Sequence, residues 1–123
     1  MGQDLLVQIL TGIVALIHFG FGALEIGAWG RVSGRLLGYD PEMANRTRAL
    51  GINQGVYNLF LAAGLTLTLL QPEGLEPMRM FLLGCVVVAG LIGQVTVGRS
   101  NVFLGLQAFP AILAMVVSGS AFA

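Results

Sequence analysis

Charged residues are scarce in this chain of 123 residues: Asp, Glu, Lys and Arg together make up 10% of it, and hydrophobic residues make up 56%. An ordinary soluble domain carries about 25% charged residues. A water-exposed surface with so little charge would aggregate. The shortage of charge therefore excludes an ordinary soluble domain. It predicts an integral membrane protein, folded as a single domain over residues 1–123.

The chain also lacks the residues that metal and redox sites need. It has one cysteine, Cys85, and one histidine, His18. A single cysteine cannot form an intramolecular disulfide, and one Cys with one His cannot complete a zinc site. There is no glycine-rich phosphate loop after a strand and no serine elbow. We therefore expect neither a bound metal nor a cofactor.

Four apolar stretches are each long enough to cross a bilayer as a helix. They occupy about residues 5–29, 47–70, 78–97 and 102–122. The longest connection is Gly30–Arg48, in which Asp40 and Pro41 resemble a helix start. Pro110 is expected to kink the last helix, which membrane helices tolerate. The predicted fold is an all-α bundle of four transmembrane helices.

Lysine is absent, and the six arginines are distributed unevenly. There is no basic cluster of the kind that binds nucleic acid, so nucleic acid is not an expected partner. Only Arg79, at the start of the third predicted helix, lies on the side of the second of the three loops. The other arginines belong to the first and third loops, on the opposite side: Arg31, Arg35, Arg46, Arg48 and Arg99. The positive-inside rule then predicts cytoplasmic first and third loops, with both termini outside.

Polar and small residues of the first predicted helix recur at alternating steps of four and three, which places them along one seam. The seam consists of Thr11, Ala15, His18, Gly22, Glu25 and Trp29. Ala15 and Gly22 would let a neighbouring helix approach closely. Trp29 falls where an interfacial aromatic residue is expected.

The second predicted helix opens with a polar cluster, Asn53, Gln54, Tyr57 and Asn58. Asn53, Tyr57 and Phe60 share one helical face, and Gln54 and Asn58 lie beside it. Gln94 in the third helix and Gln107 in the fourth fall at the same depth as this cluster and Glu25. Polar groups in a bilayer are costly unless they face protein or water. The convergence predicts one polar pocket in the cytoplasmic half of the membrane.

The segment Asn53–Leu65 reads NQGVYNLFLAAGL, and it resembles the core of the domain-of-unknown-function 1304 family. The resemblance extends to His18 with Glu25, to Leu83–Gly90, and to Gln107 with Pro110. It implies a small bacterial four-helix membrane protein of the cytoplasmic membrane. It implies no activity, since the family has none that can be transferred.

The leading functional hypothesis is a pocket for a small lipophilic ligand, in which acid–base chemistry such as isomerisation, epimerisation or cyclisation takes place. His18 and Glu25 are the candidate acid and base, and Tyr57 is an auxiliary donor. The remaining candidates would bind or orient the ligand: Trp29, Asn53, Gln54, Asn58, Gln94 and Gln107.

Two other classes stay open on the sequence alone. A small proton-coupled transporter could work as a dimer around one membrane carboxylate, and Gly51 with Gly55 is a candidate contact for a homo-oligomer. Alternatively, the protein is a structural or regulatory subunit whose polar groups only join helices, with Glu25 at the interface beside Arg31 or Arg35. Membrane lipids are expected partners in every case.

Overall fold

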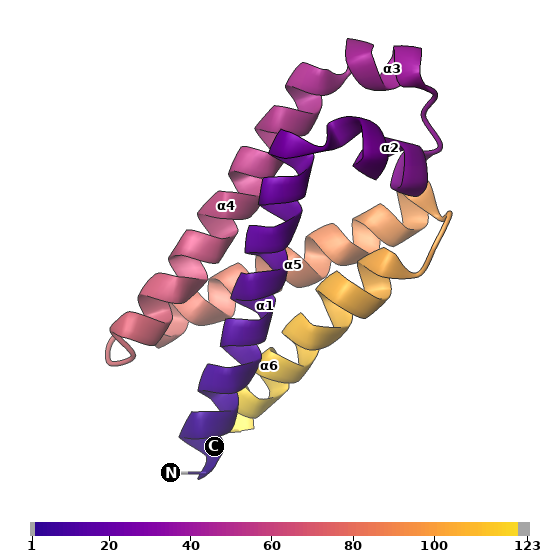
Figure 1. The fold of residues 1–123 in the computed structure, drawn as a ribbon. Coiled ribbons are helices and arrows are strands. Elements are labelled where there is room, and N and C mark those ends of the chain that lie inside the picture. The colour runs from indigo at the N-terminus through magenta and orange to yellow at the C-terminus, as the bar shows by residue number, and fades with distance from the viewer. Residues whose placement is uncertain (1, 121–123) are drawn as a thin grey trace.

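The structure is a computed structural model that describes residues 2–120, and the chain is helical throughout that range apart from short connections. Its elements are α1 (Gly2–Gly27), α2 (Trp29–Leu37), α3 (Pro41–Arg46), α4 (Arg48–Leu70), α5 (Glu76–Val97), η1 (Phe103–Ala108) and α6 (Phe109–Ser120). Figure 1 shows α1 beside α4, and α5 beside the continuous η1–α6 rod. The predicted all-α class is confirmed for the described residues.

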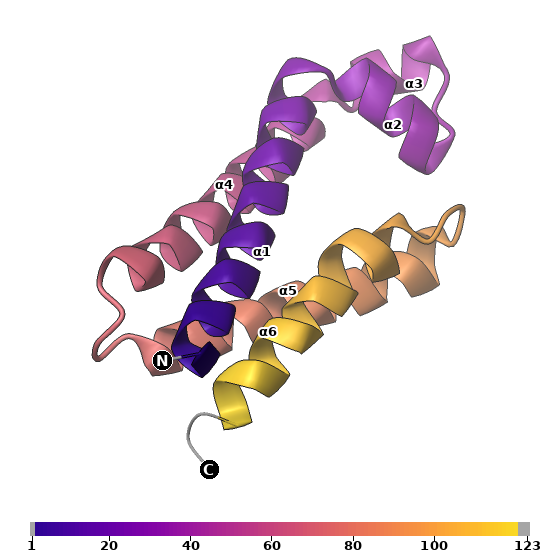
Figure 2. The same cartoon turned by 60° about the horizontal axis from the view of Figure 1, so that its bottom comes forward.

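The two arginine-rich connections lie at one end of the molecule. Figures 1 and 2 both show the end of α2 close to the loop between α5 and η1, with α3 next to α2, and the start of α1 and the end of α6 at the opposite end. The contact is direct, because the Arg99 side chain lies so close to Gly38 that a methyl group there would overlap it. The two connections therefore lie at the same end of the molecule, as the predicted bundle requires.

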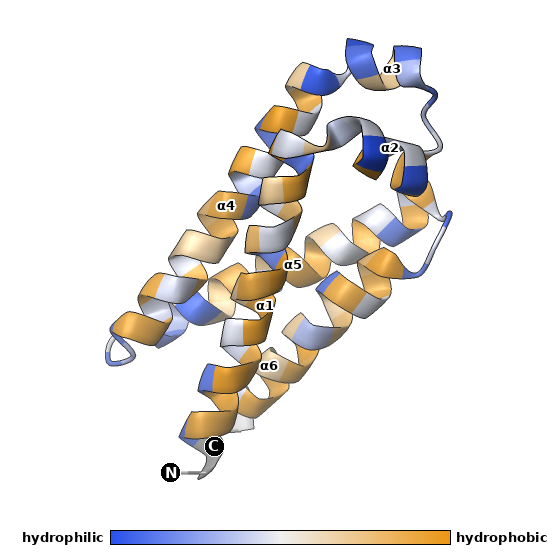
Figure 3. Cartoon of the chain, viewed as in Figure 1, coloured by the Kyte–Doolittle hydropathy of each residue, from blue (hydrophilic) through white to orange (hydrophobic). Residues whose placement is uncertain are grey.

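The end of the molecule that carries the arginine-rich connections is also its more hydrophilic end. Figure 3 shows hydrophilic residues concentrated in α2, α3 and the first turns of α4, whereas the long helices are mostly hydrophobic. Two helices are long and apolar enough to cross a membrane, Asp4–Gly27 within α1 and Glu76–Val97. The stretch Phe103–Gly119 is a shorter apolar helix. The 23 residues of α4 are long enough to span, so its polar first half is what separates it from the other two.

The prediction of a loop over Gly30–Arg48 is wrong in its first half, because the chain forms the helix α2 there. The chain turns at Ala28, whose carbonyl accepts hydrogen bonds from the backbone N–H groups of Arg31 and Val32. Trp29 consequently begins α2 and does not end α1. The expected helix start is confirmed, because the carboxylate of Asp40 accepts a hydrogen bond from the Met43 N–H at 2.8 Å and Pro41 opens α3.

The last helix begins with a wide π-helical segment, η1, which ends at Ala108, two residues before Pro110. Proline lacks the N–H that would continue the α-helical hydrogen-bond ladder, and the chain widens where that bond is missing. The Phe109 N–H accordingly bonds to the Leu104 carbonyl five residues earlier. Pro110 was expected to kink this helix, and the distortion takes the form of a π turn. Residues 121–122 of the predicted helix lie outside the described residues.

The helices pack through small residues. A methyl group on Gly55 of α4 would lie 2.8 Å from the Gly22 carbonyl oxygen of α1, so this pair of glycines sets the closest approach of the two helices. The core of the bundle contains few large side chains and several alanines. It is formed by Val14, Ala15, Leu65, Leu83, Val86, Ala111 and Ala114.

Candidate functional site

The seam predicted on the first helix faces the interior. Thr11, His18 and Glu25 are all buried, with exposed fractions of 0%, 1% and 8%. Ala15 and Gly22 lie between them and are buried too. The steps of four and three therefore identified the inward face of α1 correctly.

Glu25 is joined to α4 by a buried hydrogen bond. The side-chain amide of Asn58 donates to Oε1 of Glu25 at 3.0 Å. The other carboxyl oxygen, Oε2, is buried and accepts no hydrogen bond from any described residue. Glu25 is therefore not an interfacial anchor paired with Arg31 or Arg35. One carboxyl oxygen is held by Asn58, and the other is buried without a partner among the described residues.

A cavity of about 250 Å³ opens beside Glu25. Its polar lining comes from Glu25, Trp29, Ser33, Gln54 and Gln107. The rest of the wall is apolar and consists of Val32, Leu36, Leu37, Gly93, Val97 and Phe103. An apolar wall with a few polar groups is typical of a small-molecule site, and we refer to it below as the Glu25 cavity. Since α1, α2, α4, α5 and η1 all contribute, the site depends on the complete fold.

Four of the nine residues predicted from sequence thus line one cavity: Glu25, Trp29, Gln54 and Gln107. Asn58 does not line the cavity, but its side-chain amide holds the lining residue Glu25 by a hydrogen bond. Gln94 is half-buried next to the lining residue Gly93. The oxygen of its side-chain amide, Oε1, is buried without a hydrogen-bond partner among the described residues.

Asn53 and Tyr57 lie elsewhere. Both are exposed, Tyr57 by 59%, and its ring packs edge-on against Phe60 with the ring centroids 6.0 Å apart. Neither residue lines the Glu25 cavity. The structure therefore divides the polar cluster of α4 between an inward face and an outward face, whereas the sequence suggested one patch.

His18 is buried near the middle of α1 and is bonded to its own helix. Its Nδ1 lies 3.0 Å from the Val14 carbonyl oxygen, and its ring packs edge-on against Phe21. A carbonyl oxygen only accepts hydrogen bonds, so Nδ1 must carry a proton. His18 stands two helical turns from Glu25, about 10–11 Å along the axis, and it does not line the Glu25 cavity.

The helix α2 supplies side chains that sequence reasoning did not select. Ser33 is fully buried, and it lines the Glu25 cavity with Val32, Leu36 and Leu37. The signal was present, because residues 29, 32, 33, 36 and 37 follow the spacing of one face of an amphipathic helix. Gly34, Gly38 and Pro41 masked it by suggesting a loop.

A family model described as a protein of unknown function (DUF1304) matches residues 12–118. The match covers nearly the whole chain and includes every residue of the Glu25 cavity. The chain belongs to this family. For this DUF1304 protein, the resemblance carried by Asn53–Leu65 is confirmed, and the family description adds no activity. No curated protein and no solved structure matches the chain.

Proposed function

We propose that this DUF1304 protein is a four-span membrane protein that binds a small lipophilic molecule in the Glu25 cavity. The observation that carries the proposal is the buried Glu25 carboxyl group, with one oxygen held by Asn58 and the other without a partner. A buried polar atom without a partner is destabilising by about 1–3 kcal/mol. A hydrogen-bond donor on a ligand would relieve that penalty.

The membrane placement is supported by the outer surface. Large apolar side chains are exposed on each of the long helices, including Leu16, Leu70, Phe81 and Phe109. A surface of this kind is stable against lipid and unstable in water. We add α4 and η1–α6 to the two apolar spans because their exposed sides carry the same kind of residue.

The arginine distribution supports an orientation. The end that carries α2, α3 and the α5–η1 loop contains all the arginines except Arg79. We therefore place this end in the cytoplasm and the termini outside, in the bacterial cytoplasmic membrane. The Glu25 cavity then lies in the cytoplasmic half of the bilayer.

The lining limits the chemistry that is available. Glu25 is the one acidic or basic side chain among the residues of the cavity, and the amides of Gln54 and Gln107 supply donors and acceptors. A single carboxylate can take a proton from one carbon of a ligand and return it to another carbon, which leaves the carboxylate unchanged. The arrangement therefore fits an isomerisation by one base better than a reaction that needs a separate acid and base.

The single tryptophan allows a direct test, because Trp29 lines the cavity. The purified protein in detergent would be titrated with small isoprenoid alcohols, ketones and benzoquinones while Trp29 emission is followed. Saturable change is expected for at least one class. Glu25→Gln should weaken it about 10- to 100-fold, since a hydrogen bond to a charged group contributes about 1.5–3 kcal/mol.

The matched control is Glu42→Gln, which removes an exposed carboxylate on α3 and should leave the titration unchanged. Equal titrations for wild type and Glu25→Gln would refute the cavity as the ligand site.

A further inference from the structure

We propose that the outer groove between α1 and α4 holds one anionic phospholipid, with its phosphate beside Arg48 and one of its two acyl chains along the two helices. This inference rests on the membrane placement proposed above. It does not depend on a ligand in the Glu25 cavity.

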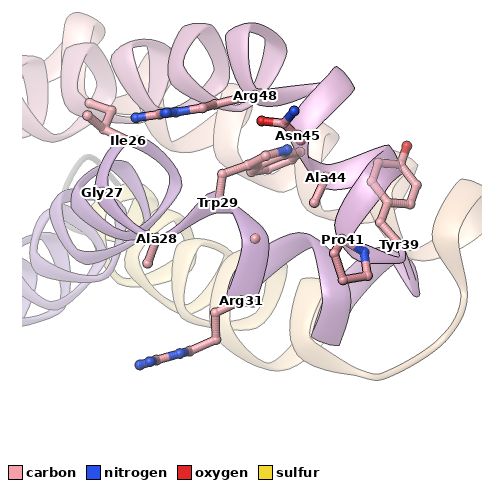
Figure 4. Close-up of a pocket in the computed structure, with 11 residues that line it drawn as sticks. Ile26, Gly27, Ala28, Trp29, Arg31, Tyr39, Pro41, Ala44, Asn45 and Arg48 are labelled. Atoms are coloured by element: carbon pink, nitrogen blue, oxygen red, sulfur yellow. The ribbon is translucent and has the colours of Figure 1, made fainter.

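The polar end of this groove is a cleft of about 630 Å³ between the end of α1, the start of α2, α3 and the start of α4. Its polar side chains include Arg31, Arg48, Asn45 and Tyr39, and none of the described carboxylates lines it. Figure 4 shows Arg48 extended along α4 toward Ile26, with Asn45 and Trp29 near the root of its side chain. The cleft therefore presents positive charge and amide donors beside an aromatic ring.

The charge in this cleft is uncompensated. Arg46 pairs with Glu42 at 3.9 Å, but neither Arg31 nor Arg48 has an ion-pair partner within residues 2–120. Guanidinium groups bind phosphate with parallel N–H donors. A phosphate is thus the complementary group for Arg48, and the surrounding bilayer supplies it in its headgroup layer.

The apolar end of the groove is a second cleft, of about 690 Å³, formed only by α1 and α4. Gly12, Leu16 and Phe19 face Leu59 and Ala63 across it. The hydroxyl of Thr66 also lines the cleft, but it donates to the Ala62 carbonyl at 2.7 Å and is already satisfied. The cleft therefore offers a mostly hydrocarbon surface, suited to an acyl chain.

The two clefts lie on one continuous face. On α4, positions 48, 52, 59, 63 and 66 follow the helical spacing of a single stripe, and on α1 so do 12, 16, 19, 23 and 26. Between the clefts this stripe carries Ala23, Ile52 and Val56. Along the helix axes, Leu59 stands about 16 Å from Arg48, and Phe19 about 10 Å from Ile26. An acyl chain that begins beside Arg48 therefore reaches the near end of the apolar cleft across the roughly 15 Å of hydrocarbon in one leaflet.

The test is native mass spectrometry of the detergent-purified protein, incubated with phosphatidylglycerol and phosphatidylcholine of identical acyl chains. We expect one phosphatidylglycerol to be retained over phosphatidylcholine by about fivefold, equivalent to about 1 kcal/mol. Arg48→Gln should remove that preference. Arg46→Gln should keep it, because Arg46 is exposed and already paired with Glu42.

The acyl chain is tested separately. Ala63→Phe fills the apolar cleft and should lower retention of both lipids, whereas Ala89→Phe, at an exposed position of α5, should not. Added inorganic phosphate should fail to displace the lipid. Displacement by phosphate, with Ala63→Phe behaving as wild type, would reduce the site to an anion site and overturn the proposal.

Equal retention of the two lipids by wild type, or an unchanged preference in Arg48→Gln, would also overturn it. A failure of the membrane placement itself has a different signature, because the protein would then fractionate with soluble proteins in the absence of detergent. A failure of the Glu25 cavity would leave the lipid preference intact, and Glu25→Gln serves as that check.

Discussion

The two faces of α4 carry similar side chains with opposite surroundings. Asn58 is buried and donates to Glu25, whereas Asn53, five residues earlier, is exposed. Five residues turn a helix by about 140°, so two asparagines at this spacing cannot face the same partner. Position along the helix axis therefore decides whether polar groups lie at the same depth. The rotation of each helix about its axis decides which of those groups are in contact.

The largest effect on folding stability is expected where α4 touches α1, because a larger side chain there would overlap the neighbouring helix. Gly55→Leu should destabilise the fold by about 3 kcal/mol or prevent folding, because its first added carbon would already lie 2.8 Å from the Gly22 carbonyl oxygen. Gly20→Leu on α1 has no atom within 4 Å of the added carbon and should be tolerated. Thermal unfolding in detergent, followed by circular dichroism, compares the two. Similar unfolding midpoints would mean that α1 and α4 are not in close contact.

A smaller loss of folding stability is expected when Asn58, the buried asparagine of α4, is replaced, and a negligible loss when Asn53 is replaced. Asn58→Leu leaves Oε1 of Glu25 buried without its donor and should cost about 1–3 kcal/mol of folding stability. Asn53→Leu changes an exposed residue and should stay within about 0.5 kcal/mol of wild type. Equal losses in the same unfolding assay would show that both asparagines are buried in the assembled protein.

Several parts of this arrangement could be predicted from sequence because they depend on local or periodic signals. The four long helices follow from apolar length, the inward seam of α1 from steps of four and three, and the start of α3 from Asp40 followed by Pro41. Each of these signals is contained in a few neighbouring residues. None of them requires knowledge of how two helices are rotated relative to one another.

The parts that could not be predicted depend on packing between helices. The rotation of α4 is set where Gly55 meets Gly22 of the same chain, whereas the sequence offered Gly55, with Gly51, only as a contact for a homo-oligomer. The π turn arises because Pro110 removes one hydrogen bond, and its wide backbone then packs against Gly90 of α5. The first half of the Gly30–Arg48 connection was predicted as a loop, although it forms the helix α2, one face of which lines the Glu25 cavity.

A double-mutant cycle sharpens the comparison of the two faces. Glu25→Leu and Asn58→Leu remove the two partners of one buried hydrogen bond, so their effects should be non-additive by about 0.5–3 kcal/mol. Glu25→Leu with Asn53→Leu should be additive within about 0.5 kcal/mol, since Asn53 lies on the opposite face. Coupling of Glu25 to Asn53 as strong as its coupling to Asn58 would contradict the rotation of α4 described above.

The smallest effect is expected for Tyr57, which sequence reasoning placed beside Glu25 as a proton donor. Tyr57→Phe keeps the ring that packs edge-on against Phe60 and removes only the hydroxyl group from a residue that is 59% exposed. Folding stability should therefore change by less than about 0.5 kcal/mol. Ligand titrations followed by Trp29 emission should also be unchanged, because Tyr57 does not line the Glu25 cavity. The matched variant is Gln54→Leu, which alters a lining residue of the same helix and should weaken the titration. A loss of binding in Tyr57→Phe that equals the loss in Gln54→Leu would restore Tyr57 to the site and would require α4 to rotate when the ligand binds.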